Sequence, residues 1–184
     1  RILKKLKRGP QVVLPKDLGI IVSFSGMNKE SIVVDAGTGS GFAAIFFASI
    51  AKKVITFESR EDFFKLASEN IKKSGLKNIE MRKEDFFEAI ENINEEVDII
   101  FLDLPEPERI FSKNFKVKEF IVAYLPNFEQ VKNFCLAAKK NGYEFFVVRC
   151  IAEEILVREF GTRPKNKGLF HTGFLCFVDC SFTS

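Results

Sequence analysis

The sequence predicts an α/β domain built on a doubly wound, mostly parallel sheet of seven strands, with helices on both faces. Two observations support this prediction. Short apolar runs alternate with segments in which apolar residues recur at helical spacing, the pattern of strand–helix–strand units. The chain has 184 residues, of which 46% are hydrophobic, which suits a single domain with a sizeable core.

The first half of the chain supplies four of the expected strands. In the segment between the second and third strands, Phe63, Leu66, Ala67 and Ile71 recur at helical intervals. The fourth strand contains four consecutive apolar residues, which indicates burial on both faces. Strands are expected at residues 32–34, 54–57, 79–82 and 97–102, and helices at residues 42–51, 60–74 and 86–93.

The second half supplies three more strands, and the last of them can run antiparallel. Asn141 and Gly142 form the expected stop of a long helix. Ligands of such sheets bind outside the carboxyl ends of the strands, so residues that end strands are the first candidates for a site. Strands are expected at residues 120–123, 143–150 and 172–179, with the helix at residues 128–140.

Charge and cysteine usage exclude several classes of protein. The net charge of +3 is too small to indicate a nucleic-acid binder by itself. No apolar run approaches the roughly 20 residues that span a bilayer, so we expect a cytoplasmic protein without a membrane partner. Cys176 and Cys180 lack the spacing of a strong zinc site and the chain has one His, so we expect buried free thiols and no metal.

A glycine-rich loop follows the first strand. The stretch "DAGTGSGF" runs from Asp35 through Gly37, Gly39 and Gly41 into a helix, and glycines there allow close backbone approach to a ligand. The dinucleotide fingerprint is G-x-G-x-x-G, whereas this loop has the G-x-G-x-G form of S-adenosylmethionine enzymes. We therefore favour S-adenosylmethionine over a nicotinamide cofactor, with contacts from Asp35, Gly37, Thr38, Gly39, Ser40, Gly41 and Phe42.

Carboxylates gather at the predicted carboxyl edge of the sheet. Asp35, Glu58 and Asp103 end three strands, and Asp85 lies in the loop after another. Four like charges on one edge repel each other, which suggests a ligand with cationic or hydroxyl groups. Glu58 is placed to accept the ribose hydroxyls and Asp85 the adenine amino group. Prolines flank Glu106 just beyond Asp103 and restrict the backbone there.

Several motifs, in order over nearly the whole chain, resemble those of the T-loop tRNA (adenine(58)-N1)-methyltransferase family. They are "RGPQVVLPKDLGIIV" (8–22), "DAGTGSG" (35–41), "LDLPEP" (102–107), "LPNFEQV" (125–131), "RP" (163–164) and "HTGFL" (171–175), together with Glu58 and Asp85. The first and last motifs and "LDLPEP" are specific, whereas many methyltransferases share the glycine loop.

The resemblance implies a Rossmann-like class I methyltransferase fold and a role for each matched residue. It implies that S-adenosylmethionine is held by the glycine loop, Glu58, Arg60, Asp85, Phe86 and Asp103, and by a strand near Gln11 and Val13 that passes beside the cofactor. Asp103 is the implied catalytic acid. Arg163 and His171 resemble positions near the target nucleotide. The implied partners are tRNA and further copies of the chain in a homotetramer.

The sequence departs from the family at three places. Asp35 stands where the family usually has Glu, and Glu108 follows "PEP" where the family usually has Trp. Family members also carry an N-terminal β-rich domain before "RGPQ". We therefore expect that this chain begins partway through a longer protein, with a leading segment and helix (residues 1–30) before the methyltransferase domain (residues 31–184).

Three other functions remain open at this point. A methyltransferase for a small molecule or protein side chain would turn over without RNA. A non-catalytic tRNA-binding subunit would keep the fold, although such subunits of this family have lost the glycine loop that is retained here. A nicotinamide oxidoreductase would show cofactor-dependent stabilisation by a dinucleotide instead.

Overall fold

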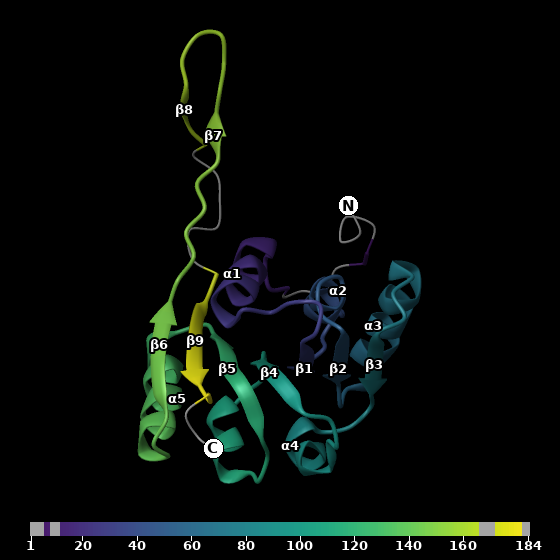
Figure 1. Cartoon of the computed structure of the whole chain (residues 1–184). Coiled ribbons are helices and arrows are strands. Elements are labelled where there is room, and N and C mark those ends of the chain that lie inside the picture. The colour runs from purple at the N-terminus through teal and green to yellow at the C-terminus, as the bar shows by residue number, and fades with distance from the viewer. Residues whose placement is uncertain (1–5, 8–11, 166–171, 182–184) are drawn as a thin grey trace.

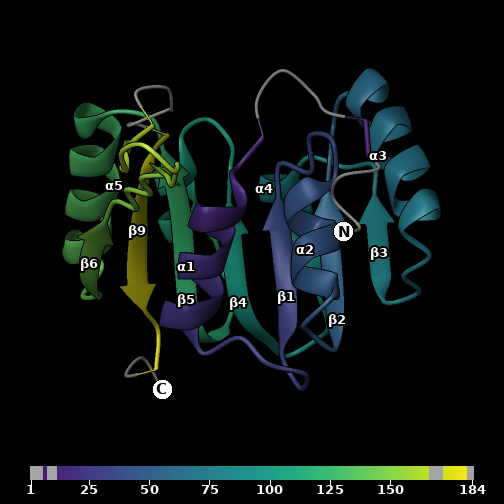
Figure 2. The ribbon, with the colours of Figure 1, turned by 90° about the horizontal axis from the view of Figure 1, so that it is seen from above.

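The computed structural model describes residues 6–7, 12–165 and 172–181. Seven strands form one sheet in the order β3-β2-β1-β4-β5-β9-β6 (Figures 1 and 2). Strand β9 is antiparallel to both of its neighbours, and the other pairs are parallel. The predicted fold class is therefore confirmed. The strands are β1 (Ile32–Ala36), β2 (Lys53–Phe57), β3 (Ile79–Arg82), β4 (Val97–Leu102), β5 (Val117–Leu125), β6 (Glu144–Val148) and β9 (Phe174–Asp179).

Helices cover both faces of the sheet. On one face, α1 (Pro15–Ser25) and α2 (Phe42–Ala48) bury Leu18, Ile21 and Phe47, and α3 (Glu61–Ser74) lies beside α2 (Figure 2). On the other face, α4 (Phe86–Ala89) and α5 (Phe128–Lys140) bury Phe86 and Phe134. Each face has its own apolar cluster, which is the two-sided burial that near-continuous apolar strands require.

Some boundaries differ from those expected. Strand β5 begins at Val117, three residues before the predicted start at residue 120. The early residues were not recognised as strand because Lys118 and Glu119 are charged and exposed. The helix expected over residues 86–93 is the short α4 followed by a 3₁₀ turn (Ile90–Asn92), which turns Ile90 into the core. Residues 12–14 form no strand, contrary to the strand expected near Gln11 and Val13, and Gln11 itself lies outside the described residues.

An antiparallel pair of two-residue strands was not expected. Strands β7 (Ile155–Leu156) and β8 (Arg163–Pro164) pair only with each other and project beyond the sheet (Figure 1). We call residues 151–165 the arm. It follows the carboxyl end of β6, so it leaves from the edge of the sheet where the other parallel strands also end. Among its exposed residues are Val157 and Phe160.

In the part of the chain that the structure describes, no helix is long and apolar enough to cross a membrane.

Candidate active site

The glycine loop is pressed against the end of β4. Gly37 has a φ of +96°, and a Cβ atom there would lie 2.2 Å from the carbonyl oxygen of Asp103. The amides of Gly37 and Thr38 both donate to the carbonyl of Phe57, at 3.1 and 3.0 Å. Only glycine allows this approach, and it brings the loop after β1 together with the ends of β2 and β4.

A buried asparagine holds the loop from its outer side. Asn70 of α3 is fully buried and donates to the carbonyls of Ser40 (2.8 Å) and Lys7 (2.9 Å), while its side-chain oxygen accepts from the Lys7 amide at 3.1 Å. Gly41, with a φ of +81°, packs against Ala67 of the same helix. These hydrogen bonds could not be predicted from the sequence, in which Asn70 is simply one position of an amphipathic helix.

Asp35 ends a chain of buried hydroxyl groups. The Thr56 hydroxyl donates to Asp35 Oδ2 at 2.6 Å, and Thr38 Oγ1 lies 2.5 Å from Thr56 Oγ1. Asp35 Oδ1 is enclosed and has no hydrogen-bond partner among the described residues. Burial, opposed by the Thr56 hydrogen bond and aided by the charges of Asp103 and Glu58, raises the pKa of Asp35 to about 7. The expected contact with a cofactor stays a prediction, since in this conformation it needs a shift of the loop or a bridging water.

Glu58 is buried just after β2 and accepts four hydrogen bonds. They come from the Gly39 amide (2.9 Å), the Arg60 amide (3.0 Å) and two atoms of the Arg60 guanidinium (3.0 and 3.3 Å). A carboxylate offers about four lone-pair positions, so all of them are in use. The Arg60 guanidinium also lies 4.0 Å from the centre of the Phe63 ring. A ribose hydroxyl would have to replace part of the Arg60 side-chain contact.

Asp85 has a structural role that leaves one oxygen available. Its Oδ1 accepts from the amides of Phe87 (2.8 Å) and Glu88 (3.3 Å), which makes it the N-terminal cap of α4. The side chain is exposed. Phe86 is buried against Phe57, with ring centroids 5.6 Å apart, so its ring serves the core.

The backbone on both sides of Asp103 is held in place. Its amide donates to the carbonyl of Ala36 at 2.9 Å, and Pro107 is buried at the start of a 3₁₀ helix (Pro107–Ser112). Between the prolines, Glu106 has a φ of +52°, the left-handed region that side chains other than glycine rarely adopt. The prolines thus fix a sharp turn directly after the acid.

The environment of Asp103 shifts its protonation. Water reaches the residue, yet the protein around it is dense enough that desolvation raises the pKa of Asp103 to about 6, against the opposing charge of Arg60. The fully enclosed Asp35 is shifted further, to about 7. Two carboxyl groups at one sheet edge whose pKa values lie close to neutral pH are typical of a functional site.

The structure brings together the loop, Glu58, Arg60 and Asp103, but it does not bring every expected residue there. Arg163 lies on β8 of the arm, away from the glycine loop (Figure 1), and its guanidinium donates to the carbonyl of Pro164. Val13 is buried in the core beside α1 and α2. His171 lies outside the described residues. The roles proposed for these residues stay predictions.

Three polar residues near this edge of the sheet were not among the predicted site residues. Lys16, Asp17 and Thr172 form a partly buried cluster joined by hydrogen bonds. The available signal was their position: Lys16 and Asp17 lie in "RGPQVVLPKDLGIIV", and Thr172 lies in "HTGFL".

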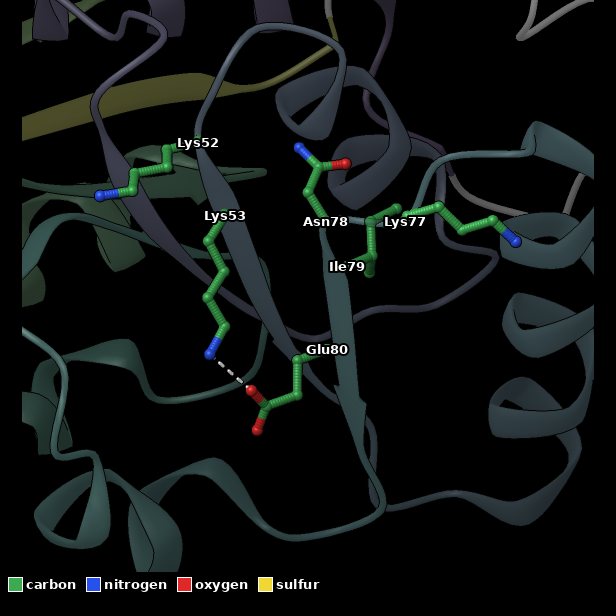
Figure 3. Close-up of a pocket in the computed structure, with 6 residues that line it drawn as sticks. All are labelled: Lys52, Lys53, Lys77, Asn78, Ile79 and Glu80. Atoms are coloured by element: carbon green, nitrogen blue, oxygen red, sulfur yellow. Dashed lines mark ion pairs between the residues drawn. The ribbon is translucent and has the colours of Figure 1, made fainter.

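A shallow pocket at the opposite edge has the wrong chemistry for the same role. It lies at the amino ends of β2 and β3, where Lys53 makes an ion pair with Glu80 (Figure 3). Lys52 and Lys77 point away from each other in Figure 3, so their charges do not converge on a ligand. The acids at the carboxyl edge remain the candidate site.

The strand order, the glycine loop after β1 and the acids after β2 and β4 together define a class I methyltransferase fold, the fold of S-adenosylmethionine-dependent enzymes. The model of the family described as "tRNA methyltransferase complex GCD14 subunit" matches residues 4–172, and the chain belongs to this family.

Curated relatives from several organisms match most of the chain. It is 34% identical to the tRNA (adenine(57)-N(1)/adenine(58)-N(1))-methyltransferase TrmI of Methanocaldococcus jannaschii, over 95% of this chain and 73% of that protein. Identity to TrmI of Thermus thermophilus is 30%, over 94% of this chain and 71% of the relative. Identity to the tRNA (adenine(58)-N(1))-methyltransferase catalytic subunit of Dictyostelium discoideum is 31%, over 83% of this chain and 51% of that protein.

Solved structures match equally well. The tRNA (m1A58) methyltransferase TrmI of Aquifex aeolicus superimposes with a TM-score of 0.83 at 28% identity, covering 97% of this chain and 73% of that one. A structure from Thermotoga maritima described as an S-adenosylmethionine-dependent O-methyltransferase gives a TM-score of 0.86 at 25% identity, covering 96% of this chain and 69% of that one.

Proposed function

We propose that this chain is the catalytic part of a tRNA methyltransferase that transfers a methyl group from S-adenosylmethionine to N1 of adenine 58. The observation that carries the proposal is the contact between Gly37 and the Asp103 carbonyl, which sets a held acid against the glycine loop. Family membership and the relatives named above support the nucleotide and the atom.

The residues at the sheet edge fit S-adenosylmethionine. The loop has room at Gly39, where the nearest atom to an added Cβ would be 3.9 Å away. Glu58 carries acceptors for the ribose hydroxyls once Arg60 yields its place, and Asp85 has an exposed carboxylate for the adenine amino group. Asp35, whose enclosed Oδ1 has no partner among the described residues, would supply negative charge behind the loop once the ammonium group binds, because a nearby cation favours the ionised form of a carboxyl group with a pKa of about 7. When bound, the cofactor supplies an electrophilic methyl group.

Asp103 acts on the target base. Adenine N1 has a lone pair and needs no strong base, but the methylated ring is cationic unless the exocyclic amine loses a proton. The Asp103 carboxylate accepts a hydrogen bond from that amine, which orients N1 and offsets the developing positive charge. A pKa of about 6 leaves Asp103 mostly ionised at neutral pH and able to take the proton.

Assembly and tRNA binding involve the arm in this proposal. Its exposed Ile155, Val157 and Phe160 offer apolar area to other copies in a homotetramer. Arg158 and Arg163 on the same arm offer charges for phosphates. The target base must leave the folded tRNA to reach Asp103, at a cost of a few kcal/mol for unstacking. We place the protein in the cytoplasm, where such tRNA would be modified.

The test is methyl transfer from labelled S-adenosylmethionine to two tRNA transcripts that differ only by adenine or guanine at position 58. We expect N1-methyladenosine from the adenine transcript alone. Transfer to a small molecule or protein without RNA would favour the O-methyltransferase-like alternative, to which the Thermotoga structure is similar. Binding of tRNA without transfer to any acceptor would favour a non-catalytic subunit.

A further inference from the structure

Two sequence motifs about 155 residues apart meet in one partly buried polar cluster. The Lys16 ammonium donates to Asp17 Oδ1 (2.7 Å), to Thr172 Oγ1 (2.7 Å) and to the carbonyl of Cys150 (2.8 Å). The Thr172 hydroxyl in turn donates to Asp17 Oδ2 at 2.8 Å, across a separation of 155 residues. We call Lys16, Asp17 and Thr172 the clamp.

Every group in the clamp is satisfied. An ammonium has three N–H donors and Lys16 uses three; both Asp17 oxygens accept, and the Thr172 hydroxyl both donates and accepts. The Asp17 side chain is 1% exposed and that of Lys16 18%. A buried ion pair is a poor source of stability because of its desolvation cost, but a fully connected network fixes one geometry. The clamp is therefore better suited to holding the segments it joins in one geometry than to raising the free energy of unfolding.

The clamp ties to α1 the chain on either side of the arm. Cys150 follows β6, where the chain leaves for the arm, and Thr172 precedes β9, where the chain returns. Lys16 and Asp17 both belong to the first turn of α1. The Lys16 ammonium thus bonds to the segment after β6, the segment before β9 and its neighbour Asp17 in α1.

The clamp is also connected to the catalytic edge. Leu102, the last residue of β4, pairs with Ala123 of β5, so Asp103, just after β4, follows next to Tyr124 of β5. Gly173, next to Thr172, lies against the Tyr124 ring: a Cβ atom there would be 2.6 Å from Tyr124 Cζ. Burial raises the pKa of Tyr124 to about 12, and the charges of both Asp17 and Asp103 act on the same hydroxyl. Tyr124 therefore lies between the clamp and Asp103.

We propose that Lys16, Asp17 and Thr172 are positioning residues for tRNA methylation, which hold the base of the arm and the Tyr124 ring in a fixed relation to Asp103. The inference rests on the proposed function and assigns these residues no contact with the cofactor. Loss of the clamp is expected to misplace the target base while leaving the cofactor site intact.

The test compares Thr172→Val with Thr172→Ser in the full-length protein. Valine keeps the shape and removes the hydroxyl, whereas serine keeps both hydrogen bonds. Phe134→Leu, in α5 on the other face of the sheet, serves as the control for a loss of core packing. For each protein we would measure kcat/KM for tRNA, the S-adenosylmethionine dissociation constant, and hydrogen exchange of the described arm residues, all well below the unfolding temperature.

We expect Thr172→Val to lower kcat/KM for tRNA by about tenfold or more, since misplacement by about 1 Å can cost on the order of 100-fold. Its cofactor affinity should stay within about twofold of wild type and its arm amides should exchange faster, with Thr172→Ser close to wild type. If Thr172→Val does not fold, Lys16→Arg carries the same expectation, because a planar fork cannot replace three ammonium donors.

Two results would overturn the inference: a Thr172→Val protein no slower than Phe134→Leu, or a loss of cofactor affinity equal to the loss of kcat/KM. Failure of the proposed function is seen separately, as a wild-type protein that methylates no adenine-58 transcript. In that case the clamp has no methylation to position, and the inference falls with it.

Discussion

Replacing Gly37 by alanine tests whether the glycine loop and the catalytic acid form one unit. The added Cβ would lie 2.2 Å from the Asp103 carbonyl oxygen, whereas real Cβ contacts are not closer than 3.0 Å, so loop and acid must separate by at least 0.8 Å. The two atoms nearest to the added Cβ are the carbonyl oxygen and carbon of Asp103, which are backbone atoms and cannot rotate away. The Asp103 amide is itself hydrogen-bonded to the Ala36 carbonyl. The shift therefore falls on the turn that aims Asp103.

The expected magnitude has two parts. A side chain at a φ of +96° costs roughly 1–2 kcal/mol, and forced movement in a packed region costs roughly 1–3 kcal/mol. We expect a loss of about 3 kcal/mol of unfolding free energy, or about 6–12 °C in Tm for a chain of this size. Misplacement of Asp103 by about 1 Å should lower turnover on the order of 100-fold.

The assay pairs thermal unfolding with methyl transfer to the adenine-58 transcript. Gly75→Ala is the matched control: its φ is +76° and no atom lies within 4 Å of an added Cβ, so only the backbone cost remains. We expect it to lose about 2–8 °C, the equivalent of roughly 1–2 kcal/mol, and to keep its turnover. A Gly37→Ala protein that unfolds like Gly75→Ala, or turns over within twofold of wild type, would refute the reasoning.

Three further predictions concern the acid, its neighbouring charge and the arm. In the proposed mechanism the carboxylate form of Asp103 is the active one, so kcat/KM should fall about tenfold per pH unit below a pH of about 6. The Asp103→Asn variant should lower kcat about 100-fold or more and remove this acid limb of the pH profile, and normal turnover would contradict the assignment. Because the charge of Arg60 lowers the pKa of Asp103, Arg60→Met should move the acid limb to higher pH, and an unmoved pH–rate profile would rule out the coupling. Changing Val157 and Phe160 of the arm together to serine should dissociate the proposed tetramer in light scattering, with exposed Phe128, outside the arm, changed to serine as the control; an unchanged mass would exclude the arm as the contact.

The parts of the fold that follow from apolar periodicity were predictable. The expected strand runs overlap all seven strands of the main sheet, and Asp35, Glu58 and Asp103 do meet at one edge, because parallel strands end together. The cap formed by Asn141, with Gly142 at a φ of +83°, was also readable from sequence. The cysteines of the described residues form no disulfide bond, and Cys176 and Cys180 are buried as expected.

The parts that depend on contacts between distant residues were not predictable. The start of β5 is disguised by charged residues whose side chains reach solvent. The hydrogen bonds from the Arg60 side chain to Glu58 depend on the backbone conformation of the turn after β2. They could not be predicted even though the two residues are only two positions apart. The meeting of Lys16 with Thr172 depends on where β9 inserts in the sheet, and neither segment contains that information alone.

The pairing of β6 with β9 has a consequence for how this protein can change in evolution. The two strands are paired in register, with Val148 opposite Leu175, so this edge of the sheet is held by strand pairing and not by the residues that join the two strands. Lengthening a connection between fixed ends costs little, about 0.6 kcal/mol for each doubling. The arm can therefore diverge in length and sequence among relatives while the catalytic body keeps its architecture, and a protein engineer could exchange it as a separate module.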